Sequence, residues 1–358
     1  MSRIPQRHSL VTETAAILRE AIAGGEWNKG LPGELELSNR LRVSRTTIRA
    51  ALAALQREGL ISSGQGRRRE IRQASAPANK LPASESVALL TPEPLHRLNS
   101  TTVFWIDALR EHLASHGWTL RVVVSAATYR QNPGTALSEL AAREKAGAWV
   151  LYRSTEQIQR WFETSNSPCV VAGTVHTGVR LTSVDRDYRA ASHHAAGVLL
   201  GRGHRQLGLL RPSAPLAGDL ETEAGFREGL TNRTAATLHV AEHNGTPAGV
   251  THALRRMLAG FTPTAIYVIQ STHFATVMTW LSSNGYRIPT HISLISRDDD
   301  PFLDHLFPEP ARYSLDPASF ARKISRQVLD LVRNGSETRR QYLVMPTFVP
   351  GGTIASRE

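Results

Sequence analysis

The stretch that decides the fold of the first domain runs from Val43 to Ile71 and reads VSRTTIRAALAALQREGLISSGQGRRREI. Its apolar residues recur at helical spacing and form one stripe, made of Ile48, Leu52 and Leu55. Ser44, just before the stripe, is a good N-cap because its hydroxyl can accept a hydrogen bond from a free amide of the first turn. The pattern predicts a helix that begins after Ser44 and ends at Gly59.

The same helix carries a basic face, and a basic hairpin follows it. Arg45 and Arg49 lie one turn apart, away from the apolar stripe. The segment LISSGQGRRREI predicts two short strands around a glycine-rich tip. A helix with arginine and short polar side chains near its N-terminal end fits a DNA major groove, and a basic hairpin can reach phosphates or the minor groove. The pattern indicates a winged helix-turn-helix; the alternative is a small helical domain with a solvated arginine face.

Two further helices are predicted before this one. Apolar and small residues recur at helical spacing in the first, at Thr14, Ile17, Leu18, Ala21 and Ile22, and the pair Gly24 and Gly25 ends it. Pro32 suits the start of a second, short helix, in which Leu37 and Leu41 lie one turn apart. Three helices and a hairpin make a complete winged domain.

The segment LPGELELSNRLRVSRTTIRAALAALQREGLI resembles the DNA-binding domain of the GntR family of bacterial transcription regulators, over roughly residues 8–72. The resemblance implies DNA contacts by Arg45, Thr46, Thr47 and Arg49 of the third helix and by the wing at Gly66. The wing departs from the family pattern, because Arg67, Arg68 and Arg69 follow Gly66 where the family more often has Thr and an aromatic residue, and we expect these arginines to carry more of the phosphate binding. Two other positions also depart. Gly33 stands where the family usually has serine, and Leu35 stands where it has an arginine that contacts DNA.

Composition and charge agree with a nucleic-acid partner. The chain has 358 residues, 41% of them hydrophobic and 20% charged, which suits two or three packed domains. Residues 1–80 hold 14 Lys and Arg against 7 Asp and Glu, whereas the remaining 278 hold 28 against 24. The basic excess therefore lies at the N-terminus, as expected for contact with a polyanion; a solubilising surface is the alternative. A single cysteine, and no apolar run of membrane-spanning length or signal-peptide character, predict a cytoplasmic protein.

The segment RQASAPANKLPASES lacks periodicity and is predicted to link two domains. After it, strand patterns (SVALLT, LRVVVS, AWVLY, LGLL, AIYVI and ISLIS) alternate with helix patterns, including helices around residues 102–116 and 135–146. Such alternation predicts an α/β fold with parallel sheets covered on both faces, and its length suggests two lobes. The expected domains are 1–73 for the winged helix-turn-helix, 74–85 for the linker, and 86–358 for a two-lobed effector-binding and dimerisation domain.

Four stretches identify the second module more closely: SVDRDYRAASHHAAGVLLGRGHRQLGLL, AGFREGL, AIYVIQSTHFATVMTWLSSNGYRIPTHISLISRDDD and SLDPASFARKISRQVLDLV. They occur in the order seen in the lactose-repressor family, and the resemblance covers about residues 86–354. It implies a periplasmic-binding-protein-like domain with two lobes, an effector cleft between them, and a homodimer. A GntR-type N-terminal domain joined to such a module is similar to the arabinose repressors of Gram-positive bacteria.

Ligands of open α/β sheets bind beyond the carboxyl ends of the strands, so polar residues there are candidates for effector binding. They are Thr91, Ser125, Arg153, Asp185, Thr222, Gln270, Ser271, Asp298 and Asp316. The resemblance implies that Asp298 is the acid that meets the effector. A carboxylate at this position can accept hydrogen bonds from hydroxyl groups.

The cleft also departs from the family pattern. Thr222 stands where the family commonly has a ligand-binding arginine, three residues before the Gly of AGFREGL. The family's Asn-Asp pair is replaced by Ser271-Thr272, and its Gly-Phe pair by Ser296-Arg297. Arg153 or Arg211, at other strand ends, are candidates to replace the missing arginine. The acids of RDDD would instead suit an amine-bearing ligand, so the sequence leaves the effector class open between sugars and other metabolites.

No pattern indicates catalysis, a cofactor or a metal site. The histidines are dispersed, and the sequence has no nucleophile elbow and no phosphate-binding loop. We therefore expect a transcription regulator, most simply a repressor, that binds a double-stranded DNA operator as a homodimer and responds to a small-molecule effector. Two alternatives remain: an architectural DNA-binding protein with a degenerate pocket, and an enzyme that processes a metabolite in the cleft.

Overall fold

The computed structural model describes residues 10–23, 27, 30–41, 43–57, 60–62, 85–231, 236–334 and 339–357. The chain divides into two compact units, Met1–Leu81 and Pro82–Glu358. This division falls inside the segment 74–85 that is predicted to be a linker. The predicted wing hairpin, with Gly66, Arg67, Arg68 and Arg69, and most of the linker lie outside the described residues.

The described part of the N-terminal unit contains three helices, α1 (Leu10–Ala23), α2 (Glu34–Leu41) and α3 (Arg45–Arg57). Helix α3 begins after Ser44, whose Oγ accepts a hydrogen bond of 3.1 Å from the amide of Thr47, so the predicted N-cap is confirmed. The helices enclose one core, formed by Ala15, Leu18, Leu31, Leu37, Ile48, Ala51, Leu52, Leu55 and Ile61. The predicted stripe of α3 lies in this core, whereas Arg45 and Arg49 are exposed on the outer side.

The C-terminal unit contains two six-stranded sheets, each the centre of one lobe. In lobe 1 the strand order is β11-β5-β4-β3-β1-β2. These strands are β1 (Ser86–Thr91), β2 (Thr119–Val124), β3 (Ala148–Tyr152), β4 (Cys169–Ala172), β5 (Thr182–Arg186) and β11 (Gln341–Val344). All their pairings are parallel.

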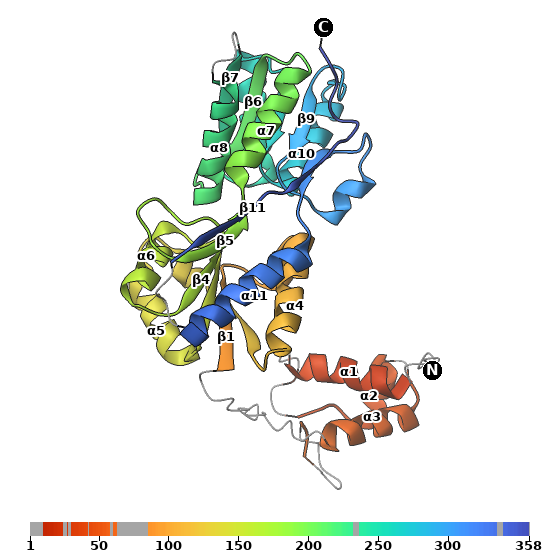
Figure 1. The fold of residues 1–358 in the computed structure, drawn as a ribbon. Coiled ribbons are helices and arrows are strands. Elements are labelled where there is room, and N and C mark those ends of the chain that lie inside the picture. Colours follow the sequence, from red (N-terminus) through yellow and green to blue (C-terminus); the bar gives the residue numbers. More distant parts are fainter. Residues whose placement is uncertain are drawn as a thin grey trace, which may run out of the picture. The chain divides into compact units, whose positions relative to one another are not determined.

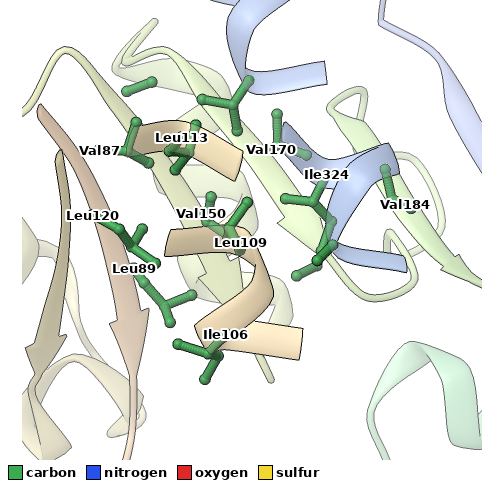
Figure 2. Close-up of a cluster of buried hydrophobic side chains, with 14 of the residues drawn as sticks. Val87, Leu89, Ile106, Leu109, Leu113, Leu120, Val150, Val170, Val184 and Ile324 are labelled. Atoms are coloured by element: carbon green, nitrogen blue, oxygen red, sulfur yellow. The ribbon is translucent and has the colours of Figure 1, made fainter. Parts of the chain in front are cut away.

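Helices cover both faces of the lobe 1 sheet. Its four α-helices are α4 (Ser100–Ala114), α5 (Gly134–Glu144), α6 (Glu156–Thr164) and α11 (Pro317–Asn334), with short 3-10 turns at Leu95–Arg97 and Ala126–Tyr129. Leu89 and Val150 point to the face covered by α4 and α11 (Figure 2), whereas Ala88 and Leu151 point to the face covered by α5 and α6. Adjacent strand residues thus serve opposite faces, which explains why the strands are continuous apolar runs in the sequence.

Lobe 2 repeats this plan with the order β12-β10-β9-β8-β6-β7. Its strands are β6 (Gln206–Pro212), β7 (Thr237–His243), β8 (Ala265–Val268), β9 (Ser293–Ser296), β10 (Ala311–Ser314) and β12 (Thr347–Val349). Helices α7 (Tyr188–Gly201) and α8 (Ala217–Leu230) cover one face, and α9 (Pro247–Gly260) and α10 (Ser271–Ser283) cover the other. A 3-10 turn, Pro301–His305, follows β9. Only the edge pair β10–β12 is antiparallel among the described pairings, a departure from the all-parallel prediction.

The chain passes from one lobe to the other after β5, after β10 and after β11. Helix α11 therefore packs beside α4 in lobe 1 although most of lobe 2 separates them in the sequence (Figure 1). The antiparallel β12 follows from the last crossing, because the chain returns to the edge of lobe 2 beside β10 from the opposite direction. The predicted two-lobed α/β architecture is confirmed, and the crossings place the ends of several strands at one cavity.

Candidate functional site

A cavity of about 270 Å³ lies in the C-terminal unit and is lined by residues of both lobes. Residues that follow the carboxyl ends of parallel strands contribute to it, including Arg153 after β3, Gly173 after β4 and Asp298 after β9. This is the place where open α/β sheets bind ligands. We call this cavity the cleft.

Arg297 is the most extensively bonded charged group of the cleft. Its side chain is 6% exposed, and its Nη1 donates to Asp219 Oδ1 at 2.8 Å and to Thr222 Oγ1 at 3.0 Å. Its Nε and Nη2 donate to the two carboxylate oxygens of Asp298 at 3.1 and 3.2 Å. The guanidinium carbon lies 4.1 Å from the centre of the Tyr188 ring. Such a paired and stacked arginine is held in one position, as recognition of a ligand requires.

Local structure explains how Arg297 reaches this position. Strand β9 ends at Ser296, and the amide of Arg297 still donates to the carbonyl of Val268 in β8 at 2.8 Å. The Ser296 hydroxyl donates to the carbonyl of Asp298 at 2.6 Å, which fixes the turn after the strand. The Thr222 hydroxyl donates to the carbonyl of Gly218 one turn earlier in α8. The guanidinium of Arg297, which follows β9, therefore contacts Thr222 of α8, the position at which the family resemblance implies an arginine.

Of the two arginines predicted as replacements, one lines the cleft and the other does not. Arg153 lines the cleft, but from lobe 1. Arg211 does not line the cleft, and its guanidinium bonds to Glu223 at 2.7 Å and to Glu242 at 2.6 Å. Arg297 was noted in the sequence only as part of a replaced Gly-Phe pair. The sequence feature that could have identified Arg297 is its position directly after a predicted apolar strand. A charged residue at such a position needs a partner if it is to be buried.

Asp185, at the carboxyl end of β5, is a second buried acid of the cleft. Its Oδ2 accepts a hydrogen bond of 2.6 Å from Thr174 Oγ1, and its Oδ1 accepts one of 2.7 Å from the amide of Arg186. Burial raises the pKa of Asp185 from 3.8 to about 6, although these hydrogen bonds and nearby arginines oppose the change. Near neutral pH this carboxyl can therefore change between accepting and donating a hydrogen bond.

Aromatic side chains form an apolar part of the cleft wall in lobe 1. The ring of Trp105 lies 5.7 Å from the rings of both Tyr152 and Phe320, measured between centroids. The Tyr152 hydroxyl is within 3.0 Å of Thr102 Oγ1. Aromatic faces beside fixed hydrogen-bonding groups suit a small ligand that has both an apolar face and hydroxyl groups.

The two acids after Asp298 join the lobes. Thr101 Oγ1, near the start of α4 in lobe 1, donates to the carbonyl of Asp299 at 2.9 Å. The amide of Ser100 donates to Asp300 Oδ2 at 2.9 Å. The Asp299 carboxylate pairs with Arg312 within lobe 2, at 2.8 Å. Acids that the sequence suggests for an amine ligand are therefore bonded to the protein itself.

The structure brings together some of the candidate residues and separates others. Those that line the cleft are Arg153, Asp185, Gln270, Ser271 and Asp298. Thr91 is buried and donates to the carbonyl of Glu93, and Ser125 lies at the start of a 3-10 turn. Asp316 accepts a hydrogen bond from the amide of Ser319 at the start of α11. Thr222 lies behind Arg297 and contacts it without lining the cleft.

Sequence reasoning missed several residues that line the cleft. Besides Arg297, these include Arg97, Tyr188, Asp219, Trp105 and Tyr152. Asp219, Tyr188 and Trp105 lie in helices, where attention to strand ends could not find them. These residues reach the cleft because the two lobes face each other, and the sequence pattern alone does not reveal that arrangement.

In the N-terminal unit, the residues predicted to contact DNA lie at the start of α3. Arg45, Thr46 and Arg49 are exposed, and Thr47 is partly buried. Arg49 Nε donates to Glu34 Oε2 of α2 at 2.8 Å. The outer face of α3 is therefore polar and basic.

Two other kinds of site were sought in the described ranges. They contain no group of three or more His, Cys, Asp or Glu side chains placed to hold a metal ion. The helices whose residues are described include none with the length and apolarity needed to cross a membrane.

Comparison with known families gives two matches, one in each unit. Residues 10–71 match the bacterial regulatory proteins of the gntR family, and residues 196–354 match a periplasmic binding protein-like domain. Both resemblances inferred from the sequence are thereby confirmed. The chain joins a gntR-type N-terminal domain to a periplasmic-binding-protein-like domain.

Individual proteins agree with this assignment. The chain is 26% identical over 192 residues to the HTH-type transcriptional regulator GalS of Salmonella typhimurium, a match that covers 53% of this chain and 55% of GalS. It is 25% identical over 199 residues to the catabolite control protein A of Streptococcus mutans, covering 53% and 57% of the two chains. The chain thus spans about half the length of the curated relatives it matches.

A solved structure shows the same two-lobed fold. A LacI family transcriptional regulator from Enterococcus faecium with bound ribose superposes with a TM-score of 0.65 at 15% identity, over 76% of this chain and 100% of that one.

Proposed function

We propose that this chain, a gntR-type domain joined to a periplasmic-binding-protein-like domain, is a DNA-binding transcription regulator controlled by a small metabolite, and that it acts as a repressor. The proposal rests on one observation: the chain combines an exposed basic helix in one unit with a cleft that fits a ligand in the other. Helix α3 exposes Arg45 and Arg49 on a rigid three-helix core. A separate two-lobed unit holds the fixed Arg297 guanidinium in a cleft between its lobes.

DNA binding would use α3 as the recognition helix. Arg45, Thr46, Thr47 and Arg49 would contact base edges, because short polar side chains beside arginines let the start of a helix approach the major groove. Gly66 and Arg67–Arg69 would contact phosphates or the minor groove. A homodimer would place two such helices on a two-fold operator inside the cell, where DNA is found.

The cleft would bind a hydroxylated metabolite, with Arg297 and Asp298 as the central contacts from lobe 2 and Asp185 and Arg153 from lobe 1. The ribose-bound Enterococcus faecium regulator, which has the same two-lobed fold, supports a sugar or a related compound as effector. Binding changes operator affinity only if the effector has different affinities for two arrangements of the protein. The relevant difference would be in lobe closure, since the effector would contact both lobes.

The direct test is a titration of the full chain with the DNA region upstream of its own coding sequence, with and without a panel of sugars, polyols, sugar acids and small amines. We expect nanomolar to micromolar specific binding and at least one compound that changes operator affinity tenfold, about 1.4 kcal/mol of coupling. Equal affinity for operator and random DNA without any ligand effect would support an architectural protein instead. Turnover of a panel compound without operator preference would support an enzyme.

A further inference from the structure

The cleft is lined by more arginines than acidic residues, and only some of these groups are bonded to one another. Among the described residues, four arginines (Arg97, Arg153, Arg186 and Arg297) and three aspartates (Asp185, Asp219 and Asp298) line it, without lysine, glutamate or histidine. Asp219 and Asp298 are both bonded to Arg297. Their two negative charges exceed the single positive charge of Arg297 by one, and the other three arginines have one remaining acid, Asp185, so that the lining residues carry a net charge of +1 when Asp185 is ionised.

That remaining acid compensates only part of the positive charge. Asp185 accepts hydrogen bonds from Thr174 and from the amide of Arg186, but not from an arginine side chain among the described contacts. Because burial raises its pKa to about 6, part of the population is neutral even near pH 6. The ligand-free cleft thus carries an excess of positive charge.

Arg153 and Arg97 carry that excess at the cleft. Both side chains are exposed, and neither has a hydrogen-bond or ion-pair partner among the residues that the structure describes. Arg153 follows β3 in the left-handed backbone region, with a φ of 52°. This conformation costs a non-glycine residue about 1 kcal/mol or more and is typical of ligand sites. The third cation, Arg186, donates from Nη1 to the hydroxyl of Tyr188 at 3.1 Å.

Two of these cations lie near the same aromatic residue. Burial raises the pKa of Tyr152, whereas the hydrogen bond with Thr102 and the charges of Arg153 and Arg186 act in the opposite direction. Both guanidinium groups are therefore close enough to influence one phenol on the cleft wall. Both arginines also line the cleft, on the same side as Tyr152 in lobe 1, so an acidic group bound beside this tyrosine would lie in the field of both.

An amine-bearing ligand finds no comparable site in the cleft. Asp298 is bonded by Arg297, Asp299 by Arg312, and Asp300 by the amide of Ser100. At Asp219 or Asp298 an ammonium group would have to displace Arg297, and at Asp185 it would meet a carboxyl that is partly protonated near pH 6. At any of the three it would also meet repulsion from the unpaired cations.

We propose that the effector is an anionic hydroxylated metabolite, a sugar acid or a sugar phosphate, whose acidic group binds to Arg97, Arg153 and Arg186 while its hydroxyl groups bind to the Arg297–Asp298 pair. The inference rests on the proposed function, since it specifies the ligand of the same cleft. Arginine suits this role because its planar fork forms paired hydrogen bonds with carboxylate or phosphate oxygens.

The test is calorimetric titration of the full chain with two matched series: glucose, glucuronate and glucose 6-phosphate, and galactose, galacturonate and galactose 6-phosphate. We expect an anionic member to bind at least tenfold more tightly than its neutral parent. Comparison of the acid with the phosphate in each series identifies which acidic group the arginines select.

Variants connect that preference to the named residues. Arg153→Gln and Arg97→Gln should each reduce the affinity for the anion about tenfold and reduce the affinity for the neutral parent by a clearly smaller factor, so that the preference for the anion falls. Arg130→Gln is the matched control, because Arg130 is an exposed arginine of lobe 1 that does not line the cleft. It should bind the anion as the unaltered chain does.

The proposal is overturned if neutral sugars bind as tightly as the anions, if no member of either series binds, or if both arginine variants keep the full preference. Operator titration of the same preparations separates these failures from that of the proposed function. Specific operator binding with a neutral effector would reject only the anionic ligand, whereas loss of operator preference would reject the regulator itself.

Discussion

Thr222 and Arg297 both differ from the expected family pattern, and a direct contact links the two differences. Arg297 donates to Thr222 Oγ1, so the threonine provides both the space and an acceptor for an arginine that comes from another strand. The sequence showed each replacement separately. Their connection depends on two positions 75 residues apart in the sequence being brought together as α8 folds beside the end of β9, and helical or strand periodicity contains no information on that contact.

Asp298 is the residue whose loss should most directly separate ligand response from DNA binding. Asp298→Ala removes the acceptor of Arg297 Nε and Nη2 and leaves that guanidinium half paired. We expect the effector-induced change in operator affinity to disappear, with ligand-free operator affinity within about twofold of the original. Operator titration with and without effector measures both quantities. Asp316→Ala, outside the cleft, is the control; a normal response in Asp298→Ala would remove this residue from the site.

Asp185 should make stability depend on pH in a defined range. Its folded-state pKa of about 6 lies above the ordinary value of 3.8, so folding favours the protonated form. This contribution is fully present below pH 3.8 and is lost as the pH rises to about 6, at up to about 1.4 kcal/mol per pH unit. Asp185→Asn should therefore lack this loss of stability between pH 4 and pH 6.

Urea unfolding of both proteins across that range measures the effect as a difference. The comparison is needed because burial lowers the pKa of His243 from 6.5 to about 4, which makes stability rise over the same range. His243 is present in both proteins and its contribution cancels. Parallel stability curves for the two proteins would show that Asp185 does not titrate as described.

Among elements, α3 shows how much of a DNA-binding helix can be predicted from its sequence. Its cap, its buried stripe and its basic face all follow from periodicity and N-cap chemistry, and the structure agrees. The ion pair between Arg49 and Glu34 could not be predicted, because it depends on the angle between α2 and α3. Arg45 has no such partner among the described residues.

This difference leads to a prediction for the two arginines. Arg45→Ala and Arg49→Ala should each cost about 1–3 kcal/mol of specific operator binding if the side chains contact bases. Arg49 must first exchange an exposed ion pair of about 0–1 kcal/mol, so its loss should be the smaller one. Competition titration with operator and random DNA measures the cost, with Arg130→Ala as control. Equal losses on both DNAs would assign the arginines to phosphates.

Strands were predictable where they form an apolar run in the sequence and hard to predict where they do not. Strands β1, β3, β8 and β9 are buried on both faces, and their apolar runs are visible in the sequence. Strand β11 alternates between exposed and half-buried residues, and β12 has only three residues. Such edge strands depend on pairing with distant neighbours and have no apolar run of their own.

The contact between the end of β9 and the start of α4 should transmit lobe closure. Asp300→Ala removes the acceptor of the Ser100 amide, which should cost about 0.5–2 kcal/mol of stability and reduce the effector-induced change in operator affinity. Thr246→Ala removes a similar helix cap in lobe 2 alone, where Thr246 Oγ1 accepts from the amide of Gly249. Urea unfolding and operator titration should show similar destabilisation but an unchanged response in this control. Equal responses in both variants would contradict a role in closure.

At the scale of the whole molecule, the basic residues are distributed unevenly along the chain. The N-terminal 80 residues carry an excess of seven basic residues, whereas the much longer remainder is nearly balanced. Replacement of Arg67, Arg68 and Arg69 by alanine should weaken binding to operator and random DNA equally. The slope of log affinity against log salt concentration should fall by about 1 for each lost phosphate contact. A loss confined to the operator would show that the wing reads sequence.

The acidic run Asp298–Asp300 has a consequence for how such a regulator can acquire a new effector. Asp298 lines the cleft, and the next two residues hold α4 of the other lobe through Thr101 and Ser100. Under the proposed function, we expect a substitution that adapts this turn to another metabolite also to shift the effector concentration at which operator affinity changes. Ligand choice and sensitivity would then be inherited together, and redesign of one would require compensating selection on the other.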